Sequence, residues 1–196
     1  MTLLVRVAAL AAAFVLAGCY PTIVHPIGSS APSTADARLI GAWQSLPKGK
    51  EGKNMDNRTF VFFLQRKTGM EAVMVGAPEK GDDGGWMTFG VTTAKLGGND
   101  FMSGRTMLDD GKEGKDPNYT PVYYRIKGNM LRVYVLGSDA IEAAIKKGEI
   151  KGDVHKNSYS DDVNITADTK AVDAFFASHD PKKLFTEELG TYRRLH

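Results

Sequence analysis

The sequence predicts a mainly β protein with minor α: an antiparallel barrel or strongly curved sheet of about eight to nine strands, with two short helices near the C-terminal part. Two observations lead to this prediction. From Leu39 onwards, short apolar segments alternate with clusters of Gly, Asn and Asp, which is typical of antiparallel sheet. Helical spacing of apolar residues occurs only after Ser138 and after Asp168. We therefore expect a single antiparallel β domain over 39–196.

The expected strands are separated by turn signals throughout this domain. In chain order they span 39–45, 58–65, 70–75, 86–96, 101–108, a hairpin within 121–136, 150–155, 163–167 and 191–195. The hairpin is the clearest, because Gly128-Asn129 forms a two-residue turn between two alternating segments. The segment Arg58–Gln65 is apolar on both faces at its middle, so we expect it to be covered on both sides or to lie deep in a curved sheet.

The two helices are predicted from caps and apolar stripes. The first is expected to be capped by Ser138, and its narrow stripe consists of Ile141, Ala144 and Ile145. The second begins at Asp168 or Thr169 and ends at His179-Asp180-Pro181, with a buried stripe of Val172, Phe175 and Phe176. The narrow first stripe predicts that this helix lies on a surface.

The N-terminus has the layout of a secretory signal, with the cation Arg6, an apolar run over 7–17 and a small-residue end. The run is too short to span a bilayer, which needs about 20 apolar residues. It closes on Leu16-Ala17-Gly18-Cys19, which resembles the lipobox of bacterial lipoprotein precursors in all four positions. The resemblance implies removal of 1–18 and acylation of Cys19 on its thiol and its new amine. Because Tyr20 follows the cysteine, the chain resembles the class sorted to the outer membrane.

Residues 19–38 are predicted to be the acylated cysteine and a flexible tether, because Pro and Ser are frequent there. Such a chain has an end-to-end distance of roughly 25 Å, enough to hold a domain clear of lipid headgroups. Cys19 is the only cysteine, so no disulfide stabilises the domain. Without Arg6, the 25 Lys and Arg become 24, against 23 Asp and Glu, and this balance argues against a nucleic-acid partner.

Patterns for catalysis, metals and cofactors are missing from the sequence. The four histidines, at 25, 155, 179 and 196, share no helical face, so we expect no metal site. A calcium loop of the EF-hand type starting at Asp109 would need an oxygen ligand at Gly111 and a Glu at Thr120. There is no serine elbow and no phosphate-binding loop. We therefore expect a protein without a cofactor that is not an enzyme.

Trp43 closes the triplet Gly41-Ala42-Trp43 on the first expected strand. A Gly-x-Trp near the start of an all-β domain resembles the opening of lipocalins and other calycins. The resemblance implies a lipocalin-like barrel in which Trp43 packs across the floor and Arg193 or Arg194 lies over it, an arrangement with a cation–π basis. A barrel of about eight strands is filled by side chains or holds one small ligand.

The residues that could line such a ligand site are Phe60, Phe62, Phe89 and Tyr124. Tyr123, Tyr134, Met102 and Met107 could also line a pocket, although core packing is the favoured explanation for them. A connected apolar cavity of about 300 Å³ or more would favour ligand carriage. A filled interior with an exposed apolar patch elsewhere would favour a partner-binding function.

The sequence thus predicts a non-catalytic envelope lipoprotein, anchored in the outer membrane through Cys19 and facing the periplasm. We expect it to bind a small apolar ligand or a partner protein. The alternative is a structural or assembly module with a side-chain-filled barrel that works through its outer face. An enzyme acting on lipid or cell-wall material is the least favoured hypothesis.

Overall fold

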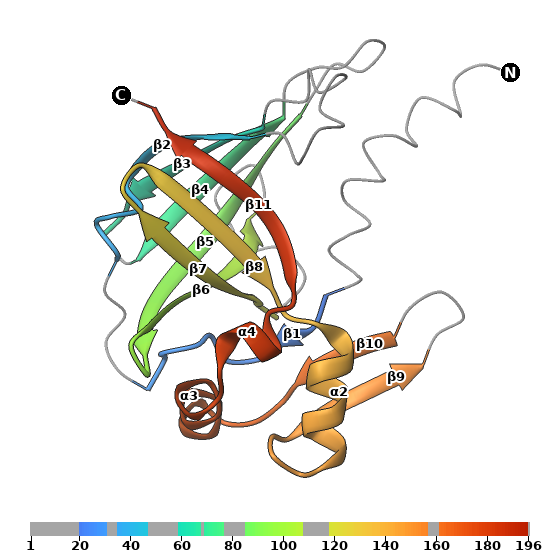
Figure 1. Cartoon of the computed structure of the whole chain (residues 1–196). Coiled ribbons are helices and arrows are strands. Elements are labelled where there is room, and N and C mark those ends of the chain that lie inside the picture. The colour runs from blue at the N-terminus through green and yellow to red at the C-terminus, as the bar shows by residue number, and fades with distance from the viewer. Residues whose placement is uncertain are drawn as a thin grey trace, which may run out of the picture.

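The computed structural model describes residues 20–30, 35–46, 59–67, 69–76, 85–107, 118–156 and 161–195. Its centre is a closed antiparallel barrel with the strand order β11-β2-β3-β4-β5-β6-β7-β8 (Figure 1). The strands are β2 (Gly41–Ser45), β3 (Thr59–Gln65), β4 (Met70–Gly76), β5 (Gly85–Leu96), β6 (Asn99–Met107), β7 (Thr120–Lys127), β8 (Met130–Val135) and β11 (Glu187–Arg194). Because β11 pairs with both β2 and β8, the ring is closed. The predicted mainly β barrel is confirmed.

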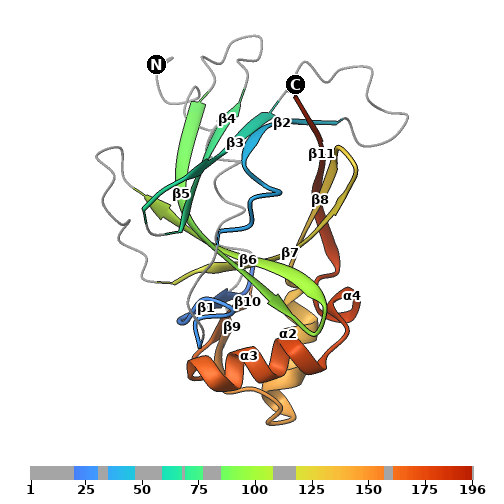
Figure 2. The same ribbon diagram turned by 90° about the vertical axis from the view of Figure 1, so that its left-hand side faces the viewer.

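The two ends of the barrel differ in their connections. At one end, the closed end, β5 turns into β6 at Gly97-Gly98 and β7 turns into β8 at Gly128-Asn129; Figure 2 shows the ring of strands from this end. Gly97 has φ 55°, and a Cβ there would lie 2.6 Å from the carbonyl oxygen of Ala177, so glycine is required. The longer connections after β2, β4 and β6 all leave from the opposite end, the mouth end.

A second layer packs against one side of the barrel (Figures 1 and 2). It contains the three-stranded sheet β1-β10-β9. Its elements are β1 (Thr22–Ile23), β9 (Gly152–Lys156), β10 (Asp161–Ile165), α2 (Ser138–Lys146), α3 (Thr169–Ser178) and α4 (Pro181–Leu184). The strands expected near 150 and 163 therefore form, but outside the barrel, because β8 pairs directly with β11.

Two apolar cores result from this arrangement. The interior core fills the barrel and contains Leu39, Trp43, Val61, Phe63, Met70, Ala72, Val91, Met102, Val122, Tyr124, Leu131, Val133, Val135 and Tyr192. The outer core lies between the barrel wall and the second layer and includes Phe101, Tyr123, Ile141, Val172 and Phe176. Successive residues of a strand face opposite sides. The pairs Phe101-Met102 and Tyr123-Tyr124 are therefore buried in different cores.

The strand expected to be covered on both faces, β3, is covered on one. Val61 and Phe63 face the interior core, whereas Phe60 and Phe62 lie on the outer face and are half-buried. The second layer packs on β6 and β7 instead, where Phe101 and Tyr123 present aromatic rings to the outer core. Cover on both faces was the wrong alternative, because consecutive apolar residues do not show which strand receives the layer. The other alternative agrees with the structure, since β3 lies between β2 and β4 in the curved sheet of the barrel.

Residues 22–30, here called the N-terminal strap, are packed on the barrel. Ile23 pairs with Tyr119 through two backbone hydrogen bonds of 2.9 and 2.8 Å. The side chains of Ile23 and Ile27 are 0% and 2% exposed in the outer core. Gly28 N donates to the Asp173 carboxylate at 2.6 Å. The predicted flexible tether is therefore wrong for these residues. The free energy gained by burying the two isoleucines exceeds the conformational entropy cost of ordering the segment.

Both predicted helices form, with one difference at a cap. Asp168 caps α3 by accepting a hydrogen bond from Ala171 N at 2.9 Å. The cap residue of α2 is Gly137 rather than Ser138, and no side chain caps that end. None of the helices in the described part of the chain is long and apolar enough to cross a bilayer.

Candidate functional site

Trp43 forms the floor of the barrel at the closed end. Its indole is fully buried and its Nε1 donates to the Leu39 carbonyl at 2.7 Å. The Arg194 guanidinium lies 4.3 Å from the centre of the indole and donates to the Ile40 carbonyl at 2.6 Å. Of the two arginines considered, Arg194 occupies this position because β11 pairs it with Trp43, while Arg193 is exposed. This cation–π contact holds the floor together.

A polar network borders the floor beside Trp43. The Tyr124 hydroxyl donates to Asp36 Oδ2 at 2.6 Å. Arg38 lies 2.7 Å from Asp36 Oδ2 and 2.9 Å from Asp100 Oδ1, and so links the two carboxylates. Burial by itself would raise the pKa of Asp36, but the hydrogen bonds from Arg38 and Tyr124 outweigh it and lower that pKa. Tyr124 is thus held by its hydroxyl inside the barrel and is less free to serve a ligand.

We expect stability to depend on Asp36 in acid. Its folded-state pKa lies below the ordinary value of 3.8, so its contribution is complete above about pH 4 and is lost as the pH falls through the lowered pKa. Asp36→Asn should cost about 1 kcal/mol at pH 7, a low figure because Arg38 is half exposed. Urea titrations from pH 7 to pH 2 should show this difference shrinking. Asp162→Asn, at an exposed site on β10, is the control; a constant difference would contradict the prediction.

The four predicted ligand-lining residues do not form one site. Tyr124 and Phe89 belong to the interior core, while Phe60 and Phe62 lie on the outer face of β3. That part of the prediction was wrong because alternation along β3 places Val61 and Phe63 inside instead. The four side chains therefore share no ligand site in the interior of the barrel.

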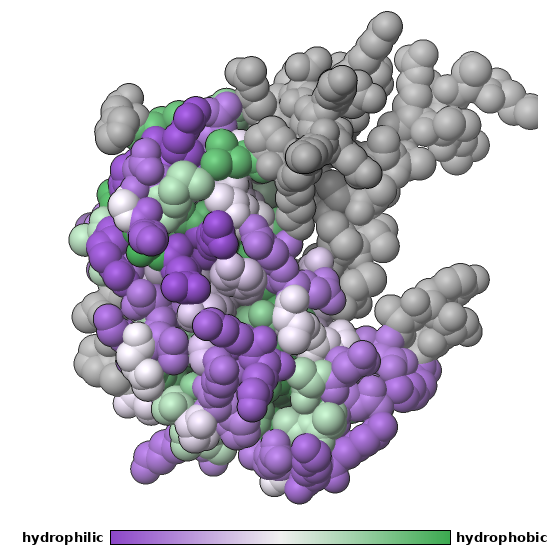
Figure 3. Space-filling model, viewed as in Figure 1, coloured by the Kyte–Doolittle hydropathy of each residue, from purple (hydrophilic) through white to green (hydrophobic). Residues whose placement is uncertain are grey.

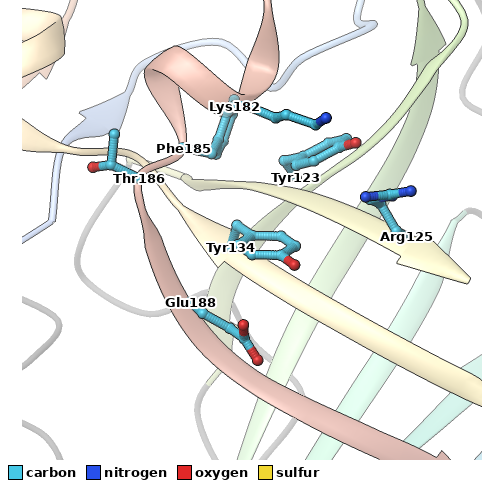
Figure 4. A pocket seen from close by; sticks show the side chains of 7 residues that line it. All are labelled: Tyr123, Arg125, Tyr134, Lys182, Phe185, Thr186 and Glu188. Atoms are coloured by element: carbon cyan, nitrogen blue, oxygen red, sulfur yellow. The ribbon is translucent and has the colours of Figure 1, made fainter.

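A pocket of about 430 Å³ lies on the outer wall of the barrel beside α4, open to solvent on one side (Figure 4). It is lined by Tyr123, Arg125, Tyr134, Lys182, Phe185, Thr186 and Glu188. These residues come from β7, β8, α4, the start of β11 and the two-residue link Phe185-Thr186 between α4 and β11. The pocket therefore exists only because α4 returns to the barrel wall just before the last strand.

The inner side of the pocket is aromatic and its rim is polar. The Tyr123 ring stacks on Tyr134 at 5.7 Å between centroids and contacts Phe185 at 5.9 Å. Figure 4 shows the Tyr123 hydroxyl, the Lys182 ammonium and the Arg125 guanidinium along one side. Burial raises the pKa of Tyr123, so its hydroxyl stays protonated and can donate. The pocket can therefore hold an apolar body and offer donors to a negative group.

The pocket opens onto a basic face of the barrel, defined here as Arg125, Lys127, Arg132 and Arg193 with Lys182 of α4. Arg125 and Arg132 are exposed and lie directly opposite each other on β7 and β8. Neither forms an ion pair with a carboxylate of the described residues. Figure 3 shows mainly hydrophilic residues on the surface over β8 and β11. Like charges directly opposite across strands are destabilising, so this face is suited to an anion.

Sequence reasoning named Tyr123 and Tyr134 but missed the rest of this pocket. Because successive residues of a strand face opposite sides, Tyr123 and Arg125 share one face of β7 and Tyr124 lies on the other. This alternation is the signal that could have placed Tyr123 and Arg125 together on the outer face. The contribution of Lys182 and Phe185 had no local signal, because it depends on where α4 packs.

Comparison with protein-family models, curated proteins and solved structures finds no match to this chain. Within the described ranges, no three His, Cys, Asp or Glu side chains are grouped so as to hold a metal ion. Cys19 and the loop after Asp109 lie outside the described residues. The geometry of the pocket and the lipobox resemblance are therefore the basis for a functional proposal.

Proposed function

We propose that this protein is a non-catalytic envelope lipoprotein, anchored in the outer membrane through acylated Cys19 and facing the periplasm. It binds a small amphipathic ligand, with an apolar or aromatic body and an anionic group, in the pocket beside α4. The observation that carries this proposal is the pocket of about 430 Å³ with an aromatic inner side and two cations at its rim. Pockets for small ligands have this size and this mixture of apolar walls and a few polar groups.

The charges around the pocket support an anionic ligand. Arg125 and Arg132 are exposed and occupy directly opposite positions on β7 and β8. A bound carboxylate or phosphate would relieve their repulsion and accept hydrogen bonds in the fork geometry that arginine offers. The Tyr123 hydroxyl adds a neutral donor at the same side.

The lining residues support binding rather than catalysis. They include no His, Cys or Ser, the usual partners in a nucleophile–base pair. The carboxylate, Glu188, accepts a hydrogen bond from the Thr191 hydroxyl at 2.7 Å. The two phenols, two cations, threonine hydroxyl and carboxylate of the pocket are suited to recognising charge and forming hydrogen bonds.

An assembly module with a side-chain-filled barrel is the second candidate. Large buried side chains, among them Trp43, Phe63, Tyr124 and Tyr192, occupy the interior. On the outer face, the register aligns Phe60, Val75 and Trp86 as one apolar row, and Trp86 is 55% exposed. A partner protein could cover this row while the interior stays filled.

Native mass spectrometry of the soluble form from Tyr20 to His196, purified from its own host, tests the proposal. We expect an adduct with the mass of an acidic amphiphile, reduced in Arg125→Glu. Lys127→Glu, on the same strand but outside the pocket, is the matched control and should keep the adduct. A clean apo mass for the wild type, or an adduct unaffected by Arg125→Glu, would count against ligand binding in this pocket.

A further inference from the structure

We infer that the mouth end of the barrel lies against the bilayer, so that the domain has one fixed orientation on the membrane. This inference rests on the proposed anchor at Cys19 and adds the surface that meets the lipid. Two separate observations lead to it: the route of the N-terminal strap and the position of the most exposed large apolar side chain.

The strap runs along the outer wall from the mouth end to the closed end. Ile23 pairs with Tyr119 just before β7 begins, at the mouth end. Further along, Ile27 N donates to Ser103 Oγ in the middle of β6 at 3.0 Å. Gly28 then lies against Ala94, near the closed end of β5. The strap therefore runs from the mouth end towards the closed end, and in the next described segment Asp36 N donates to Thr93 Oγ1 at 3.0 Å.

This route leaves no free chain between the anchor and the domain. Tyr20 already packs against the interior core, and its neighbour in the sequence is Cys19. Consecutive Cα atoms are about 3.8 Å apart, whereas a flexible tether over 19–38 would have spanned roughly 25 Å. An acyl group on Cys19 therefore keeps the side of the barrel near Tyr20 at the headgroups, and in Figure 1 the blue start of the described chain lies on the mouth side.

The apolar row of Phe60, Val75 and Trp86 lies at the same end. Trp86 is the second residue of β5, next to the mouth, and it pairs with Val75, which pairs with Phe60. At 55%, Trp86 is the most exposed of the large hydrophobic side chains in the described chain. Tryptophan at such a position is typical of the membrane–water interface, where its apolar body meets lipid and its N–H meets water.

Membrane contact at the mouth also locates the ligand pocket. Tyr134 and Glu188 pair near the mouth-end limits of β8 and β11. The pocket therefore opens on the side wall beside the lipid surface, where an anionic amphiphile would enter it from the headgroup layer.

Tryptophan quenching by brominated lipid tests this orientation, because bromine quenches only on contact. The lipidated protein is reconstituted into vesicles of phosphatidylcholine and phosphatidylglycerol, with or without brominated acyl chains. The chain has two tryptophans, Trp43 buried at the floor and Trp86 exposed near the mouth. We expect a roughly twofold loss of the Trp86 emission in the wild type and no loss in Trp86→Phe, which retains only Trp43.

Flotation of the same vesicles separates the two claims. Protein that floats without quenching of Trp86 overturns the orientation and leaves the anchor intact. Protein that does not float overturns the anchor, and the orientation with it. Insertion of a flexible Gly-Ser linker of about 20 residues between Cys19 and Tyr20 should keep flotation and weaken the quenching. Quenching that the linker leaves unchanged would contradict the claim that the short link to Cys19 fixes the orientation. A blue shift of the Trp86 emission with rising concentration of the lipid-free protein would show that a second copy covers the apolar row, and would contradict the inference.

Discussion

Replacing Trp43 by Ala is expected to lower the free energy of unfolding by about 3–5 kcal/mol, the largest stability effect of any exchange considered. The indole is fully buried and fills the closed end of the barrel. Its removal leaves a cavity and also takes away the ring over which Arg194 lies at 4.3 Å. Urea unfolding followed by far-UV circular dichroism measures the change.

Trp86→Ala is the matched control for this prediction. Its side chain is 55% exposed on the outer face, so the same exchange should cost only about 0.5 kcal/mol. Equal losses for the two variants would show that Trp43 does not form the floor of the folded barrel. A loss of unfolding free energy several times larger for Trp43→Ala than for Trp86→Ala would support the position of Trp43 at the floor of the barrel.

Under the proposed lipid anchor, replacing Cys19 by Ala should abolish lipid attachment altogether, because only a thiol at this position can take the thioether-linked lipid. Cells grown with labelled palmitate should show label on the wild-type chain and none on the variant. Each buried methylene contributes about 0.8 kcal/mol, so loss of several acyl chains removes essentially all of the anchoring.

The fate of the Cys19→Ala chain distinguishes the outcomes. Unlabelled precursor, with 1–18 still attached, agrees with the prediction wherever it fractionates. A variant that is cut at the normal site and retained in the outer membrane at the wild-type level would contradict the lipobox interpretation. Tyr20→Phe keeps the cysteine and serves as the control, with normal labelling expected.

Local patterns located most of the barrel strands, but β11 begins at Glu187, four residues before the expected 191–195. The hairpin around Gly128-Asn129 and the segment Met70–Val75 needed only alternation and turn chemistry, and both agree with the structure within one or two residues. The second layer could not be predicted in the same way. Its parallel pairing of β1 with β10 joins residues about 140 positions apart, and no local preference encodes which distant segments meet.

The order of the N-terminal strap also could not be predicted from local sequence patterns. Its composition, with Pro21, Pro26 and several small residues, is that of a linker. Ile23 and Ile27 are ordinary apolar residues in such a stretch until the outer core is assembled around them. Because burial in that core depends on Phe101 and Phe176, the order of the strap is a tertiary effect.

The sequence predicted the contact of Trp43 with an arginine but not the pocket beside α4. The floor contact of Trp43 with an arginine followed from the Gly-x-Trp resemblance, and the structure identifies Arg194 as that residue. The pocket combines Arg125 with Lys182, which come from β7 and α4. Such a combination depends on how α4 packs, and hydrophobic periodicity carries no information about it.

Titration with an anionic aromatic probe, 1-anilinonaphthalene-8-sulfonate, tests the central claim that the pocket beside α4 binds an anionic amphiphile. Fluorescence titrations should compare the wild type with the double variant Arg125→Glu/Lys182→Glu. Arg193→Glu, on the same basic face but outside the pocket, is the control. We expect the double variant to bind at least about tenfold more weakly, since it replaces two favourable charges at the rim by repulsive ones, and the control to change little. Equal affinity for the double variant and the wild type would contradict the account.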